Sequence, residues 1–112
     1  MAGGVSERLD AIRHKGMIRS ADVARIVDTR PETVSRWRQG RSHPRPEAER
    51  IILELEYVIE QLSDLYEPAQ ARLWLFSPQT LLEGRSPADA IRAGRSDEVR
   101  RLVDRVRVAV YM

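Results

Sequence analysis

Side chains that can contact bases or phosphates gather in one short stretch, residues 30–41. Arginine can hold guanine O6 and N7 with two hydrogen bonds, and Thr, Ser and Gln can pair with base edges or phosphate oxygens. If Val34 and Trp37 face inward on a helix, the polar side chains around them share its outer face. The DNA-binding residues predicted by this pattern are Arg30, Glu32, Thr33, Ser35, Arg36, Arg38, Gln39 and Arg41. The alternative is that they form the solvated face of a small helical hairpin.

Two short helices are expected to position that face. In residues 20–40, Ala24 is small where two helices can touch, and residues 28–30 interrupt the apolar spacing. This pattern predicts a helix-turn-helix. A helix over residues 5–14 is expected to lie across it and complete a three-helix head.

The start and end of the second helix have their own signals. Thr29 and Glu32 have the spacing of a capping box, and Pro31 suits a first turn, where its missing N–H costs no hydrogen bond. Gly40 is expected to end this helix in the left-handed conformation. Asp28 stands at the turn between the helices and tolerates that conformation better than most residues.

Composition narrows the possible functions. The 112 residues suffice for one domain or for two very small modules that share a core, and a 42% hydrophobic share is enough for a packed interior. The absence of cysteine excludes disulfides, thiol catalysis and thiolate metal sites. No apolar run approaches the roughly 20 residues that span a bilayer, and the first residues lack the features of a signal peptide. We therefore expect a cytoplasmic protein without a membrane partner.

The formal charge of +2 is unevenly distributed. Residues 1–46 carry ten Arg or Lys against five Asp or Glu, whereas residues 47–112 carry nine against twelve. A polyanionic partner therefore belongs at the front of the chain. Residues 41–46 contain two prolines and form a stiff linker whose Arg41, His43 and Arg45 either contact phosphates or are simply solvated.

The longest periodic segment, residues 47–66, predicts one helix of about 20 residues, or roughly 30 Å. Its wide apolar stripe needs cover from the C-terminal helices or from a second copy of the chain. We expect the acidic residues beside this stripe to form a solvated face: Glu49, Glu54, Glu56, Glu60 and Asp64. A catalytic carboxylate pair at Glu56 and Glu60 has no neighbouring base, nucleophile or glycine-rich loop, so we predict no enzyme, no catalytic or metal site and no cofactor.

Residues 67–112 predict several shorter helices. Pro68 opens one that reaches Phe76, residues 80–82 form a helical turn, and Ser86 caps a helix over 87–93. Ser96 is expected to cap the last helix. Residues 108–112 are nearly all apolar, so we expect this end to be covered by the chain itself, by a dimer mate or by another protein.

Two stretches resemble known families. SADVARIVDTRPETVSRWRQG resembles the helix-turn-helix of Xre-type regulators, with Asp28 where that pattern usually has Gly and Pro31 at a position that often contacts DNA. The C-terminal toxin-binding domain of the MbcA/ParS/Xre antitoxin family is similar to WLFSPQTLLEGRSPADAIRAG followed by EVRRLVDRV. Gln79 replaces the asparagine usual after the proline of that motif.

The resemblance implies an all-α protein, with a helix-turn-helix head over residues 1–46, a connecting or dimerisation helix over 47–66 and a C-terminal toxin-binding domain over 67–112. It implies the antitoxin of a type II pair, which covers the active-site entrance of a RES-domain toxin that degrades NAD⁺. The toxin-binding residues expected on this basis are Trp74, Leu82, Gly84, Arg85, Ser86, Pro87, Arg101, Arg105, Tyr111 and Met112.

The same resemblance implies that the chain regulates its own operon by binding promoter DNA. We expect a homodimer, because operators are commonly two-fold, and a larger hetero-oligomer with the toxin. The alternative function is a freestanding helix-turn-helix regulator or an excisionase-like DNA-binding protein. A winged module of the latter kind needs a β-hairpin after the recognition helix, and the helical pattern of residues 47–66 argues against one.

Overall fold

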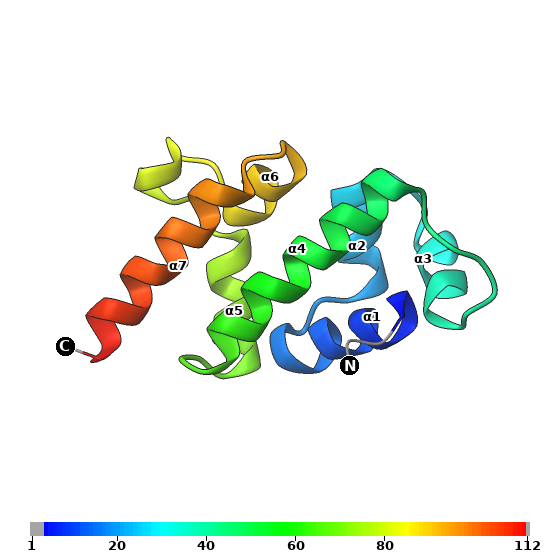
Figure 1. Ribbon diagram of the computed structural model, residues 1–112, viewed down its shortest axis with the longest axis horizontal. Coiled ribbons are helices and arrows are strands. Elements are labelled where there is room, and N and C mark those ends of the chain that lie inside the picture. Colours follow the sequence, from blue (N-terminus) through cyan, green and yellow to red (C-terminus); the bar gives the residue numbers. More distant parts are fainter. Residues whose placement is uncertain (1–3, 112) are drawn as a thin grey trace.

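The computed structural model describes residues 4–111, which are built from helices without strands (Figure 1). This confirms the all-α class. The helices are α1 (Val5–Gly16), α2 (Ser20–Val27), α3 (Pro31–Arg38), α4 (Pro46–Ser63), α5 (Pro68–Phe76), the 3₁₀ turn η1 (Thr80–Leu82), α6 (Pro87–Arg92) and α7 (Ser96–Tyr111). Across these described residues, no helix combines the length and apolar character needed to cross a membrane.

The central helix α4 organises the molecule, which measures 44 × 27 × 23 Å. The helices α1 to α3 gather toward one end and α7 with the C-terminus lies at the other (Figure 1). Contacts from α1, α2, α5, α6 and α7 cover α4, and Ile52, Leu55 and Ile59 on it are fully buried. Burying each such side chain contributes roughly 1.5–3 kcal/mol. The chain itself therefore supplies the cover that the wide apolar stripe requires.

The two short helices and the turn predicted for residues 20–40 are present as α2 and α3. Asp28 takes the left-handed conformation between α2 and α3, at φ 61°, and Gly40 takes it after α3, at φ 74°. Val34 and Trp37 are buried, as their spacing predicted. The predicted capping box is wrong, because Arg30 occupies the N-cap position and makes no side-chain cap. Pro31 at the first helical position fixes this register and leaves Thr29 one residue too early.

The predicted bounds of the central helix are too long at its C-terminal end. It ends at Ser63, because the N–H groups of Leu65 and Tyr66 both turn back to the carbonyl of Leu62. The expected solvated acidic face is wrong at three of its five positions, whereas Asp64 is exposed as expected. Three carboxylates are partly buried in ion pairs with other helices: Glu54 with Arg100, Glu56 with Arg8 and Glu60 with Lys15.

A close approach of α1 to α4 depends on Gly16. A Cβ atom at this position would lie 2.7 Å from Cδ1 of Ile59, which is fully buried in the core. The absence of a side chain therefore lets the last turn of α1 rest directly on the central helix.

The C-terminal helices begin largely where proline and serine predicted. The Ser86 hydroxyl accepts a hydrogen bond from the Asp89 N–H at 3.1 Å and caps α6, which ends at Arg92. The predicted cap at Ser96 is wrong. The N–H of Glu98 bonds the carbonyl of Arg95, so Ser96 is already inside α7, and its buried hydroxyl finds no partner.

Candidate functional site

The polar face of α3 lies on the surface, as expected from the inward turn of Val34 and Trp37. Arg30, Glu32, Arg36, Gln39 and Arg41 are exposed, and Thr33, Ser35 and Arg38 are partly exposed. The structure therefore places all eight predicted DNA-binding residues around one short helix. A surface of this kind can reach base edges from its centre and phosphates from its edges.

The arginines of this face are not neutralised by the neighbouring carboxylates that the structure describes. Arg30, Arg36, Arg38, Arg41 and Arg45 take part in none of the ion pairs formed within residues 4–111. An unpaired surface guanidinium attracts a polyanion more strongly than one already neutralised by a carboxylate. The front end of the molecule thus has both the side chains and the net charge that nucleic acid requires.

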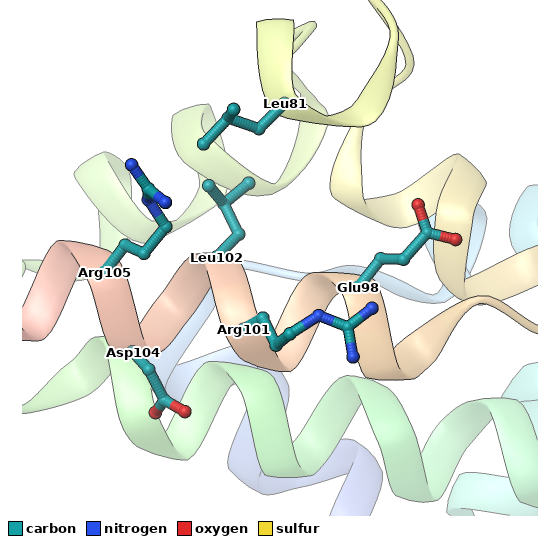
Figure 2. Close-up of a pocket in the computed structure, with 6 residues that line it drawn as sticks. All are labelled: Leu81, Glu98, Arg101, Leu102, Asp104 and Arg105. Atoms are coloured by element: carbon teal, nitrogen blue, oxygen red, sulfur yellow. The ribbon is translucent and has the colours of Figure 1, made fainter.

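At the opposite end, a hollow of about 560 Å³ opens between η1 and α7. Leu81 reaches from η1 toward Leu102 on α7, and Arg101 and Arg105 follow one another along the helix (Figure 2). Glu98 and Asp104 complete its lining. The hollow therefore combines apolar side chains with charges of both signs, which is typical of a surface that receives another protein.

A second hollow of about 350 Å³ continues along α7 and shares Asp104 and Arg105 with the first. Its further lining is Val108 and Ala109. We call the two hollows together the α7 groove. Beyond it, Val110 and Tyr111 are exposed, Tyr111 by 69%. The described residues therefore leave the apolar end of α7 uncovered. Of the three expected covers, a dimer mate or another protein remains.

The predicted toxin-binding residues fall into two groups in the structure. Arg101, Arg105 and Tyr111 are exposed on α7, and Gly84 is exposed in the turn before α6. Leu82, Ser86 and Pro87 are buried and shape the loop from inside, while Trp74 and Arg85 are partly buried. Met112 lies outside the described residues. The structure thus brings Arg101 and Arg105 together with Leu81, while Leu82, Ser86 and Pro87 are buried and expose little surface to a partner.

Arg85 and Arg95 fix the loop at one end of the groove. The Arg85 Nε donates to the carbonyl of Leu82 at 3.2 Å, and the Arg95 Nε lies 2.6 Å from the Glu98 carboxylate. Glu83 stands within 4 Å of both guanidinium groups. These contacts hold η1 against the start of α7 and so keep Leu81 over the groove.

Leu81 is a surface residue that the sequence pattern did not single out, whereas Val108 belongs to the apolar end for which cover was expected. Leu81 is 59% exposed beside the buried Leu82. The two leucines are consecutive, and one short helical turn cannot turn both into the core. Val108 lies off the stripe formed by Val99, Leu102 and Val106, so its position in the sequence already indicated that it would be exposed.

An ion pair with a buried carboxylate joins α2 to α5. Asp22 on α2 is only 5% exposed. Its carboxylate accepts two hydrogen bonds, of 2.6 and 3.0 Å, from the guanidinium group of Arg72 on α5. Arg72 also donates to the carbonyl of Met17, and its guanidinium lies 5.0 Å from the ring centre of Phe76. We call the pair Asp22–Arg72 the clasp. It fixes α5 against the helix-turn-helix.

The clasp determines the ionisation of Asp22. Burial raises the pKa of this carboxyl, but the hydrogen bonds from Arg72 and from the Arg19 N–H, with the nearby positive charge, outweigh burial. The pKa of Asp22 therefore lies below its ordinary value of 3.8. The same contact raises the pKa of Arg72, so the pair remains charged near neutral pH.

Comparisons with known proteins find relatives in both sequence and fold. The sequence model of the antitoxin Xre/MbcA/ParS C-terminal toxin-binding domain matches residues 61–107. The mycobacterial cidal antitoxin MbcA of Mycobacterium tuberculosis and of Mycobacterium bovis is 37% identical over 91 residues, 81% of this chain and 80% of the relative. One chain of the crystal structure of the M. tuberculosis MbcT–MbcA toxin–antitoxin complex matches with a TM-score of 0.84 and 31% identity, covering 99% of this chain and 100% of that one.

Proposed function

The chain belongs to the Xre/MbcA/ParS family of antitoxins, and we propose that it neutralises a RES-domain toxin that degrades NAD⁺ by covering that enzyme's active-site entrance. In this proposal residues 67–112 bind the toxin, residues 1–46 bind DNA and residues 47–66 connect them. The protein acts by binding and is not itself an enzyme. The observation that carries the proposal is its similarity, over nearly its whole length, to a chain from a toxin–antitoxin complex.

The α7 groove supports the proposed toxin contact. Arg101 and Arg105 are exposed there and form none of the ion pairs within residues 4–111, whereas Arg100 and Arg107 on the same helix hold Glu54 and Gln61. An exposed apolar floor with free guanidinium groups at its edge fits a partner surface with acidic and apolar side chains. The uncovered Val110 and Tyr111 extend the same surface toward the end of the chain.

The helix-turn-helix supports a second activity, autoregulation through promoter DNA. Its free arginines surround α3 and the linker that follows it, and α3 lies at the far end of the molecule from α7 (Figure 1). This separation allows one chain to hold a toxin and DNA at the same time. A homodimer, and a larger complex with the toxin, would present two such heads to a two-fold operator.

Co-expression tests the antitoxin activity. Cells that carry the RES-domain toxin encoded beside this chain should regain growth and NAD⁺ when the chain is present, and the two proteins should purify as one complex. Continued NAD⁺ depletion with the chain in excess would overturn neutralisation. Promoter binding without any toxin complex would instead favour the alternative, a freestanding regulator. Light scattering of the isolated chain tests the homodimer.

A further inference from the structure

We propose that a hollow between α3 and the linker 41–45 binds one backbone phosphate of DNA and thereby sets the position of α3 on the duplex. The hollow has a volume of about 380 Å³. The inference rests on the proposed DNA binding and adds to it a specific site and ligand, a phosphodiester. We call this site the linker hollow.

The walls of the linker hollow come from two segments. Thr29 and Thr33 line it from the turn and from α3, and Ser42 and Arg45 line it from the linker. Trp37, which is 6% exposed, lies beneath them with its ring held in the core. The buried tryptophan thus gives the hollow a rigid base, and residues that carry hydroxyl groups line it from both segments.

The charge of the linker hollow suits an anion. Arg36 and Arg45 both line it, and neither takes part in an ion pair within residues 4–111. His43 also lines it, but its Nε2 lies 3.5 Å from the Glu49 carboxylate, so its positive charge, when protonated, is offset. The two arginines therefore provide the charge that a bound phosphate would meet, and charge-assisted hydrogen bonds to phosphate oxygens are among the stronger ones in proteins.

The position of the hollow favours a phosphate of a DNA strand over a small free anion. Thr33 and Arg36 belong both to the hollow and to the outer face of α3, so a strand whose bases meet α3 would place its backbone at the linker. Both guanidinium groups stand near solvent, with Arg36 and Arg45 exposed. A free phosphate would have to compete with water there, whereas a duplex is held by many contacts at once.

The linker geometry keeps Arg45 in place. Pro44 is buried and Pro46 begins α4, so the residue between them has its backbone fixed on both sides. The backbone carbonyl of Arg45 accepts the N–H of Glu49 at 2.9 Å. Its side chain therefore projects from a rigid support, which reduces the entropy lost when a phosphate binds.

The first test measures binding of promoter DNA by fluorescence anisotropy over a range of salt concentrations. Arg45→Ala should raise Kd about tenfold for promoter and unrelated DNA alike and lower the salt slope by about one. Arg45→Lys should recover most of the affinity, because lysine still presents a point charge to phosphate. Arg92→Ala, an exposed arginine on α6, is the matched control and should bind as the wild type does.

The second test identifies the phosphate. Promoter duplexes carrying one neutral methylphosphonate at a time should include a position that weakens the wild type but not Arg45→Ala. A titration with inorganic phosphate, followed by NMR, provides the other arm. Saturation of the linker hollow at micromolar phosphate, with no methylphosphonate position that depends on Arg45, would assign it to a small anion and overturn the proposal.

DNA binding by variants and by the wild type distinguishes a wrong phosphate site from a wrong proposed function. If Arg36→Ala weakens DNA binding while Arg45→Ala changes neither Kd nor the salt slope, the linker hollow is not a phosphate site, although the head still binds DNA. If the wild type binds no promoter DNA, both the inference and the proposed autoregulation are overturned, while neutralisation of the toxin is unaffected.

Discussion

The α3 end and the α7 end of this molecule use arginine in different ways. Around α3, the five arginines from Arg30 to Arg45 are free of ion pairs within residues 4–111. From residue 67 onward most arginines are engaged: Arg72 with Asp22, Arg95 with Glu98 and Arg100 with Glu54. Paired arginines hold helices together, whereas free arginines are available to a partner. Their distribution therefore distinguishes an end whose arginines are available to a partner from one whose arginines mostly support the fold.

The two ends also differ in their apolar surface. The face of α3 turns Val34 and Trp37 into the core and leaves polar side chains outside. The α7 groove leaves Leu81 and Val108 exposed between free arginines. Nucleic acid offers phosphates and base edges, while a protein also offers apolar side chains to bury. The comparison therefore supports DNA as the partner of one end and a protein as the partner of the other.

Breaking the clasp should have the largest effect, because it removes an ion pair that holds α5 against α2. Asp22→Asn should lower the free energy of unfolding by about 3 kcal/mol, since Arg72 then keeps a partly buried charge without a counter-ion. Urea unfolding measures this change. Asp10→Asn, at an exposed position on α1, is the matched control and should change it by less than about 0.5 kcal/mol.

Reversing the charges of the two unpaired arginines in the α7 groove should test whether toxin and DNA bind to different surfaces. Arg101→Glu with Arg105→Glu should weaken toxin binding by about 2 kcal/mol or more, roughly thirtyfold, because both arginines line the groove. Calorimetry with the purified toxin measures this loss. Arg92→Glu, at an exposed position on α6, controls for a charge reversal away from the groove. Unchanged toxin affinity in the double variant would place the interface elsewhere.

Removing the central arginine of α3 tests the other surface. Arg36→Ala should weaken promoter binding by about 1 to 3 kcal/mol, because an exposed guanidinium that contacts base or phosphate is lost. Neutralisation of the toxin should remain intact. Gel-shift and growth-rescue assays with the same preparation measure both activities, and a parallel loss of the two would contradict separate binding ends.

Lowering the pH should weaken the clasp, because Asp22 becomes protonated. The pKa of Asp22 is lowered on folding, so its ionised form stabilises the folded state above about pH 3.8 and loses that contribution as pH falls through the lower, folded-state pKa. The difference in unfolding free energy between wild type and Asp22→Asn should therefore shrink below pH 3.8. Urea titrations between pH 7 and 3 follow it, and a constant difference would contradict the assigned ionisation.

The sequence determined where several helices of this protein begin, although the caps predicted at Thr29 and Ser96 were wrong. Pro31, Pro68 and Pro87 each begin a helix where their fixed φ and missing N–H allow one. Val34 and Trp37 are buried because one turn of helix places them on the same side. These outcomes depend on neighbours within a few residues, so the pattern of the sequence carries the required information.

The tertiary structure alone decided which side chains are free to bind. The partners Asp22 and Arg72 lie fifty positions apart, and Arg100 and Glu54 forty-six apart. Whether Arg101 remains free while Arg100 is paired depends on how α7 rotates against α4. That rotation is set by packing of the shared core, since only one face of each helix can be buried against its neighbour. The sequence could place arginines on α7, but only the packed helices select the ones that face a partner.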